Sequence, residues 1–464
     1  MSPREAAPSR RWRSFELLTV HSLTWLFAGN SVGLLLATLL LFPRLGSLLE
    51  PLSYGRFMPV HLDVLLYGWC GLPLAGLLLE LYRPRSGARA AAGDRLASFA
   101  VGAWSGSLLV GAASWLGGGS SGKLFLDWAG PARLLLAASL GCLAVVLAIL
   151  FAGQLRERTA APSPRRGERW PVFARGALLA VLATVPGVLY WASSPKVYPP
   201  INPDSSGATG GSLLGSSLVV VTVLYLFPYL VGLNRAAAGS GEGLTAGVLV
   251  LHWLFFAALD HGDRSHHEIV QILGLASLGI WWWLLWRHLR RFTWPRASRR
   301  WLAALAAWGA LLLLDGVITF LPGVLERWKF TNALVAHAHL AMAGMATSLA
   351  VLILIALTRR TTLENVFATR AAFLGWNLGN LLLTASLLTL GILEGGDPGL
   401  LIGRSATVDA LYALRWLAGA MMWAASGRWL RDALAGFRAA AGTLPAAGRL
   451  GRPAAPSLVE PCRG

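Results

Sequence analysis

Two histidines, His337 and His339, lie two residues apart within an apolar run at 331–357. Successive residues of a helix turn by about 100°, so these two imidazoles would point to nearly opposite faces of one helix. An ionisable side chain in such a run is a candidate functional group, and neutral imidazole is the commonest metal ligand. One helix could therefore hold a planar iron cofactor on each side. The alternative is a pair of histidines that hydrogen-bond to neighbouring helices.

The composition indicates a polytopic membrane protein. Of the 464 residues, 55% are hydrophobic and only 13% are charged, and long apolar runs recur along the whole chain. The formal net charge is +18. In a membrane protein, arginine clusters set the orientation of the spans, so we expect no binding of nucleic acid.

The apolar runs predict an all-α bundle of twelve transmembrane helices, each long enough to cross about 30 Å of hydrocarbon. The predicted spans lie near 15–43, 57–82, 95–117, 129–155, 171–194, 212–233, 243–260, 267–287, 301–322, 331–357, 367–393 and 407–430. The span near 243–260 is short and ends in polar residues. With twelve spans, all arginine clusters fall on one side, and basic loops stay in the cytoplasm. We therefore expect both termini to be cytoplasmic and the protein to lie in a bacterial-type inner (plasma) membrane.

Three regions follow from this pattern: a basic cytoplasmic N-terminus at 1–14, a twelve-helix membrane domain at 15–434 that would hold the cofactor, and a disordered cytoplasmic tail at 435–464. The first apolar run is too long for a cleavable signal peptide, so we expect a retained anchor. The three cysteines, Cys70, Cys142 and Cys462, form no CxxC or CxxCH motif. This excludes covalently attached haem, a thiolate-rich copper site and a disulfide framework.

Five of the nine histidines fall in the outer half of the predicted bundle: His61, His266, His267, His337 and His339. A six-coordinate haem needs two axial imidazoles, whereas a reactive haem keeps one and leaves its other face open to a gas. The adjacent pair His266-His267 could hold a second metal over that open face. The alternative for this pair is a polar loop end in the headgroup region.

Three motifs carry a resemblance to a known family. The segment LSYGRFMPVH, which ends at His61, is similar to an FGRLRPxH motif at the start of the second helix. Leu251-His252-Trp253 followed by His266-His267 is similar to VHFW…HH, and VAHAH, which ends at His339, is similar to GHVH. The chain thus resembles the catalytic subunit I of the haem-copper oxidase superfamily, closest to the branch of cbb3-type cytochrome c oxidases and nitric oxide reductases. The resemblance covers most of the twelve-helix core.

The resemblance implies two haems, of the b type, and a second metal. His61 and His339 would be the axial ligands of a low-spin haem. His337 would be the axial ligand of a high-spin haem. His266 and His267 would bind the second metal, which is copper in the oxidases and non-haem iron in the nitric oxide reductases.

The second-metal site departs from the family pattern. The family supplies a third ligand from a Gly-His motif in its sixth helix, and the equivalent position here is Ser216. A hydroxyl is a poor copper ligand compared with imidazole. The glutamate that nitric oxide reductases carry four residues later is Val220. Either His261 or Asp260 replaces the missing ligand, or two histidines and a water hold the metal weakly, or no second metal binds.

Two carboxylates are candidates for proton delivery. The family's glutamate before the tenth helix aligns with Asp315, and its redox-active tyrosine aligns with Asp260. Thr245, His252 and Asp260 are spaced to share one helical face and could relay protons. A packing role for His252 is the alternative. Asp315 is the better single candidate.

The leading functional hypothesis is the core subunit of a respiratory terminal oxidase, cytochrome c oxidase-like, that reduces O2. Nitric oxide reductase-like activity on NO is an alternative. Because the chain lacks CxxCH, the electron donor would be a separate subunit, such as a c-type cytochrome. Two further hypotheses are a dihaem electron-transfer subunit without gas reduction, because one second-metal ligand is missing, and a transporter without haem.

Overall fold

The computed structural model describes residues 13–84, 87–159, 172–197, 210–235, 242–259, 267–359 and 361–442. Within these ranges the chain is helical, with only an isolated β-bridge between Arg235 and Phe292. Helices are expected in a hydrocarbon environment, because they satisfy every backbone polar group within one segment. The predicted all-α membrane bundle is confirmed at this level.

The helices follow one another along the chain, with short connections between most of them. They are α1 (Arg13–Leu41), α2 (Leu45–Leu48), α3 (Tyr54–Asp63), η1 (Val64–Gly71), α4 (Leu72–Tyr82), α5 (Gly87–Leu116), α6 (Gly130–Thr159), α7 (Val172–Ala192), α8 (Gly210–Leu230), α9 (Glu242–Ala258), α10 (Ile269–Ala276), α11 (Gly279–Leu289), α12 (Ser298–Phe320), α13 (Leu325–Trp328), α14 (Asn332–His339), η2 (Leu340–Ala346), α15 (Thr347–Leu357), α16 (Arg370–Gly396), α17 (Leu400–Gly403) and α18 (Ala406–Gly442). The segments η1 and η2 are π-helical.

Ten helical segments of the described chain are long and apolar enough to cross a membrane. They correspond to ten of the twelve predicted spans. The predicted span near 243–260 is the shorter apolar helix α9, of 17 residues. The predicted span near 407–430 lies within α18, which is 37 residues long and carries several charged side chains toward its end. Twelve transmembrane helices therefore stay a prediction.

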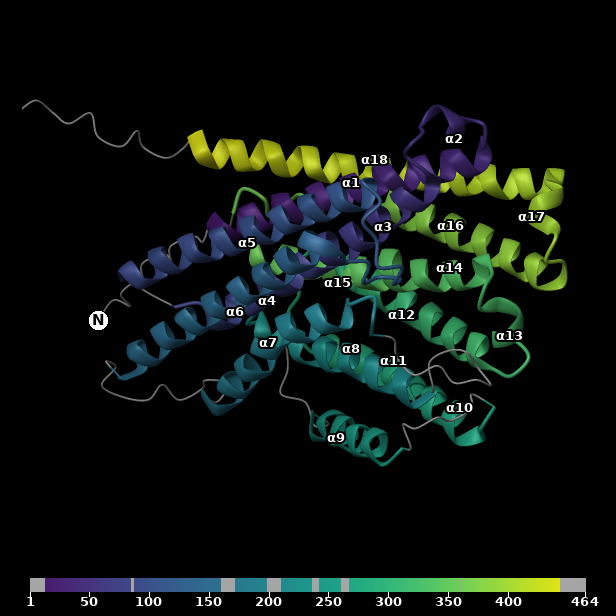
Figure 1. Ribbon diagram of the computed structural model, residues 1–464. Coiled ribbons are helices and arrows are strands. Elements are labelled where there is room, and N and C mark those ends of the chain that lie inside the picture. Colours follow the sequence, from purple (N-terminus) through teal and green to yellow (C-terminus); the bar gives the residue numbers. More distant parts are fainter. Residues whose placement is uncertain are drawn as a thin grey trace, which may run out of the picture.

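The helix α18 continues past residue 434, where the sequence predicted a tail. Ala433 is fully buried, and Leu434 and Phe437 pack against the hydrophobic core. Its far end returns to the beginning of α1, where the Arg13 guanidinium lies 5.2 Å from the Phe437 ring. The first and last described residues thus lie at the same end of the bundle (Figure 1). Residues 443–464 lie outside the described part of the chain.

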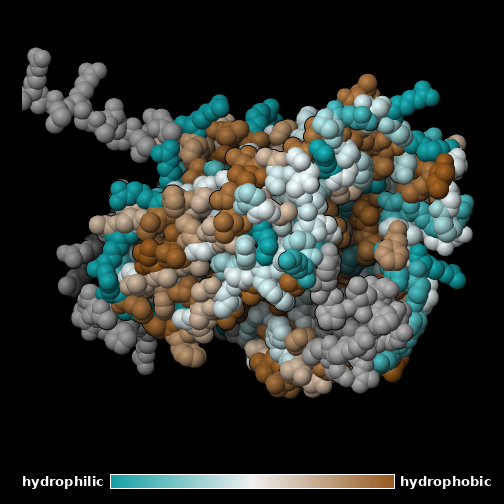
Figure 2. All heavy atoms as spheres, viewed as in Figure 1, coloured by the Kyte–Doolittle hydropathy of each residue, from teal (hydrophilic) through white to brown (hydrophobic). Residues whose placement is uncertain are grey.

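The helices that carry the candidate ligands lie at the centre of the packing. The helices α1, α16 and α18 pack together, α14 packs against α16, and α12 packs against η2 and α15 (Figure 1). Every residue of α15 except Ala356 is buried. In contrast, α7 and α9 lie at the margin and keep large apolar side chains exposed, among them Phe173 and Leu251. Hydrophobic side chains cover much of the visible face, as expected for contact with lipid (Figure 2).

Candidate functional site

The first candidate ligand, His61, lies near the end of α3. Its Nδ1 donates to the backbone carbonyl of Gly29 on α1, at 2.9 Å. This bond defines the tautomer and leaves the Nε2 lone pair free for a metal. Gly33, one turn further along α1, lies directly against the ring. A Cβ added at Gly33 would lie 2.6 Å from the Cε1 of His61, so the close approach of the two helices requires glycine here.

The second candidate ligand, His339, is the last residue of α14. Its Nδ1 donates to the carbonyl of Val335 in the preceding turn, at 2.8 Å, so its Nε2 is also free for a metal. His339 and His61 lie close enough to interact electrostatically, and both interact with Arg415. The pairing of these two imidazoles as ligands of one haem stays a prediction.

The prediction from sequence did not include Arg415, which lies on α18. Its guanidinium faces Tyr54, Tyr412 and Glu394, and its Nη1 lies 3.4 Å from the Oδ1 of Asn332. Arg415 places a positive charge beside the two imidazoles at the end of the bundle where α14 begins. An arginine inside the predicted span near 407–430 was the signal that could have revealed it.

The third candidate ligand, His337, points away from His339, toward α12. Its Nδ1 lies 2.8 Å from the Oδ2 of Asp315, and the Asp315 side chain is largely buried. A Cβ added at Gly316 would lie 3.2 Å from the Cε1 of His337. The contact with the carboxylate orients the ring and leaves Nε2 free, an arrangement common among metal-bound histidines. This contact gives Asp315 a role in orienting His337, and the proton delivery expected from the sequence stays a prediction.

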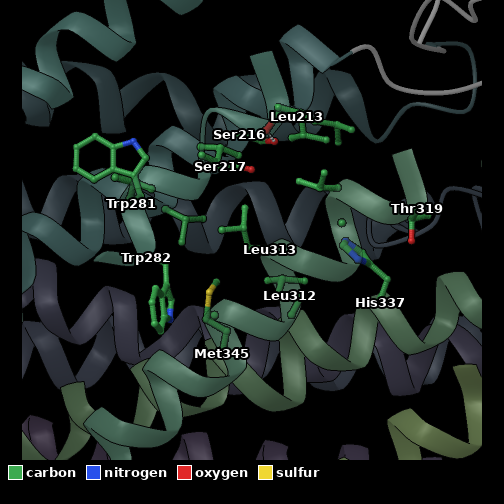
Figure 3. A pocket seen from close by; sticks show the side chains of 18 of the residues that line it. Leu213, Ser216, Ser217, Trp281, Trp282, Leu312, Leu313, Thr319, His337 and Met345 are labelled. Carbon is green, nitrogen blue, oxygen red and sulfur yellow. Dashed lines mark hydrogen bonds between the residues drawn. The ribbon is translucent and has the colours of Figure 1, made fainter. Parts of the chain in front are cut away.

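His337 lies in the wall of a cavity of about 710 Å³ (Figure 3). The other walls come from α8, α10, α11, α12 and η2, and nearly all lining side chains are apolar. This volume lies within the range of roughly 300–1,000 Å³ that is usual for cofactor and ligand sites. In Figure 3 the imidazole points into the cavity. One face of α14 thus turns toward His61, and the other faces a large apolar space.

Ser216, the residue at the position of the missing third metal ligand, also lines this cavity (Figure 3). Its hydroxyl donates to the carbonyl of Leu213 in its own helix, at 3.0 Å. Val220, one turn later, lines the same wall. The position expected to carry a ligand therefore faces the cavity, but its side chain bonds to its own backbone.

Of the predicted second-metal ligands, only His267 lies in the described part of the chain. It is exposed, and its Nε2 lies 3.0 Å from the Oε1 of Glu326 on α13. It is not among the side chains that line the cavity. Asp260, His261 and His266 lie outside the described residues. Within the described ranges, no three His, Cys, Asp or Glu side chains come together as a metal site.

The hydrogen bonds of His252 favour its packing role. The Trp281 indole donates to its Nδ1 at 2.8 Å, and its Nε2 lies 2.7 Å from the Ser277 hydroxyl. An indole N–H only donates, so Nδ1 accepts and Nε2 carries the proton. Both ring nitrogens of this buried histidine are therefore bonded to Trp281 and Ser277, as a packing role requires, and the relay through Asp260 stays a prediction.

The donor set fits haem iron at two places. His61 on α3 and His339 on α14 each have Nδ1 bonded and Nε2 free, and a six-coordinate haem requires one such imidazole on each of its two faces. His337 supplies a single imidazole at the wall of an apolar cavity, as a haem with an open face requires. No other imidazole in the described residues lines that cavity.

One comparison with known proteins found a match, in the N-terminal part of the chain. Residues 16–204 match the family model of cytochrome c and quinol oxidase polypeptide I. The matched region includes His61 and runs from the first turn of α1 past the end of α7, but it covers less than half of the chain and ends before His337 and His339. No curated protein matches the chain. The match supports the haem-copper oxidase superfamily and, in general terms, an oxidoreductase of the membrane.

Proposed function

We propose that this chain is the core subunit of a respiratory terminal oxidase, in which electrons pass from a low-spin haem to a gas at a high-spin haem. One observation carries the proposal: α14 presents two imidazoles on opposite sides, each with Nδ1 bonded and Nε2 free. One of them lies near His61, and the other lines a cavity that is large enough for a cofactor.

His61 and His339 would hold the low-spin haem as its axial ligands. The bonds from their Nδ1 atoms to carbonyl groups orient the rings, and Gly33 allows α1 to approach His61 closely. Arg415 lies beside both imidazoles, where its positive charge would neutralise a carboxylate of the bound macrocycle. The protein thus contributes ligands, orientation and charge compensation at this position.

His337 would hold the high-spin haem as its single axial ligand. The Asp315 carboxylate keeps the ring oriented and increases its basicity as a ligand. The bound haem would supply the iron that accepts electrons and binds O2 or NO. The apolar walls from α8, α11 and α12 would exclude water from the open side.

The second metal, copper or non-haem iron, would be bound by His266 and His267, with His261 or Asp260 as a replacement third ligand. The motifs that resemble the cbb3-type and nitric oxide reductase branch support this assignment. Asp315 and Asp260 are also our candidates for proton delivery. The electron donor would be a c-type cytochrome or another donor subunit, and the chain would lie in a bacterial-type inner membrane.

Visible spectroscopy of the purified protein tests the proposal. We expect the absorption bands of b-type haem, with two haems per chain, and carbon monoxide binding to one of them after reduction. If the purified protein carries no haem, the proposal is wrong. Metal analysis, together with O2 and NO turnover, then distinguishes oxidase from reductase.

A dihaem electron-transfer subunit without gas reduction is the second candidate. The Ser216 hydroxyl, which faces the cavity where the family has an imidazole, favours it. This candidate predicts two haems, no stoichiometric second metal, and no turnover of O2 or NO.

A further inference from the structure

Both helices that carry the candidate low-spin ligands change from α- to π-helix shortly after the histidine. On the first, η1 begins three residues after His61, and on the second, η2 begins directly after His339. These are the two π-helical segments in the described part of the chain. Single-turn π segments inside α-helices occur frequently at functional sites.

A π segment acts like one inserted residue. Removing it would rotate everything before it by about 100° and shift it by about 1.5 Å relative to everything after it. The parts that follow, α4 and α15, are largely buried and cannot rotate. The directions in which the His61 and His339 side chains point, relative to the buried helices α4 and α15, therefore depend on whether η1 and η2 keep their π geometry.

Tryptophan side chains from neighbouring helices bond to the backbone of each π segment. The indole of Trp104 on α5 donates to the carbonyl of Tyr67 in η1, at 3.1 Å. The indole of Trp376 on α16 donates to the carbonyl of Ala343 in η2, at 2.9 Å. In hydrocarbon, carbonyl groups loosened by a break in the α-helical pattern need partners from neighbouring elements. Each indole supplies such a partner.

A third bond connects the two ligand helices directly. The indole of Trp69, in η1, donates to the hydroxyl of Thr347 at 2.9 Å. That hydroxyl in turn donates to the carbonyl of Met342, in η2, at 2.9 Å. The Trp69 side chain is 2% exposed and Thr347 is 1% exposed, so water does not compete for these bonds.

Two glycines allow further tryptophan side chains to pack closely against η1 and η2. A Cβ added at Gly68 in η1 would lie 2.5 Å from the Cβ of Trp25, on α1. A Cβ added at Gly344 in η2 would lie 2.8 Å from the Cγ of Trp308, on α12. Each π segment is thus bonded by an indole on one side and packed against an indole on another.

We infer that Trp104, Trp376 and the Trp69–Thr347 pair are positioning residues that keep η1 and η2 in π geometry and so aim His61 and His339 at each other. The inference rests on the proposed ligation of a low-spin haem by these two histidines. None of the four residues needs to touch the haem. Their effect is exerted through the backbone of the helices that carry the ligands.

The test compares substitutions that remove these hydrogen bonds: Trp104→Phe, Trp376→Phe and Trp69→Phe, which keep an aromatic ring, and Thr347→Val, which keeps the shape of the side chain and removes both of its bonds. The matched controls are Trp301→Phe and Thr358→Val. Trp301 is a buried indole that faces the Phe367 carbonyl, and Thr358 is a buried threonine that bonds to Leu354. Neither control side chain bonds to the backbone of η1 or η2. The readout is the electron paramagnetic resonance spectrum of the oxidised low-spin haem in the full-length purified protein.

We expect each of the four variants to shift the largest g value of the low-spin signal, or to convert part of it to high-spin haem, while the controls keep the wild-type spectrum. Trp69→Phe and Thr347→Val should be less than additive when combined, because both break the bond between these two residues and only Thr347→Val also breaks the bond to Met342. If all four variants give the wild-type spectrum with normal haem content, the inference is wrong.

If variants and controls show equal shifts, the inference is also wrong, because a general loosening of helix packing would then explain the shifts. If the wild-type protein shows no low-spin signal from a haem with two histidine ligands, the proposed function itself is wrong. Thr347→Val retains shape and volume, so it tests the inference even if a tryptophan variant does not fold.

Discussion

The Asp315 carboxylate lies 2.8 Å from the Nδ1 of His337, and it links α12 to the helix that carries both central imidazoles. Asp315 thereby has a partner inside the bundle, as a carboxylate in an apolar environment requires. His337 gains a fixed ring orientation. Asp315, which the sequence predicts as a residue for proton transfer, is thus paired with His337, the predicted haem ligand whose ring it would orient.

Replacing Asp315 by Asn should weaken the binding of haem by His337. The amide keeps the shape of the side chain but lacks the negative charge that raises the basicity of the imidazole. We expect retention of the high-spin haem to fall by about 10-fold, as for other partners of metal-bound histidines. Titration of haem into the haem-depleted protein measures this. The control is Asp432→Asn on α18, a partly buried carboxylate that pairs with Arg428. Equal haem affinity of Asp315→Asn and wild type would contradict the assigned role.

Replacing His337 by Ala should abolish carbon monoxide binding to the reduced protein and leave the low-spin spectrum intact. The reason is that His337 faces the cavity, whereas His339 lies on the opposite side of the helix. Carbon monoxide difference spectra check the result, with His21→Ala as the control, because His21 bonds to Ser105 on α5. Carbon monoxide binding at the wild-type level would show that His337 is not the axial ligand.

Gly33→Ala should displace the His61 ring. The added Cβ would lie 2.6 Å from its Cε1 and 2.8 Å from its Nδ1, closer than real contacts allow. We expect loss of most of the low-spin haem, visible in the reduced absorption spectrum. Gly102→Ala on α5 is the control, since a Cβ there meets nothing within 4 Å. An unchanged spectrum in Gly33→Ala would place the haem away from His61.

Ser216→His tests whether the cavity can hold a second metal. The side chain at this position lines the cavity, so an imidazole there would supply the ligand type that is missing. We expect the variant to bind close to one additional copper or iron per chain, determined by elemental analysis. Ser217→His, at the adjacent lining position, should not show this gain. Absence of any gain in Ser216→His would mean that the remaining ligands do not converge on this wall.

His252→Leu should lower stability and leave electron transfer unaffected. The variant would leave the buried Trp281 indole without its acceptor, which costs about 1–3 kcal/mol. We expect a lower unfolding temperature and an unchanged turnover per haem. His252→Gln should recover part of the stability, because an amide can both accept from Trp281 and donate to Ser277. A variant of normal stability that has lost turnover would restore the relay hypothesis.

Much of this arrangement follows from local sequence. The apolar runs dictated membrane helices, because hydrocarbon tolerates few alternatives for a polar backbone. The spacing of His337 and His339 predicted opposite faces, and the structure places one toward Asp315 and the other toward His61 and Arg415. Both results depend only on helical periodicity, which a sequence shows directly. The number of spans was less certain, since α9 is short and α18 carries charges along its length.

Tertiary structure alone decided which side chains meet. Nothing in the spacing of Asp315 and His337 indicated their contact, nor that Arg415 would reach the two other imidazoles, because these pairs depend on how distant helices rotate and pack. The π segments are a further case: the runs at 64–71 and 340–346 have ordinary helical sequences. Their geometry is supported by indoles that come from other helices. Local sequence preferences determine where the helices form, and packing between the helices determines the directions in which their histidine side chains point.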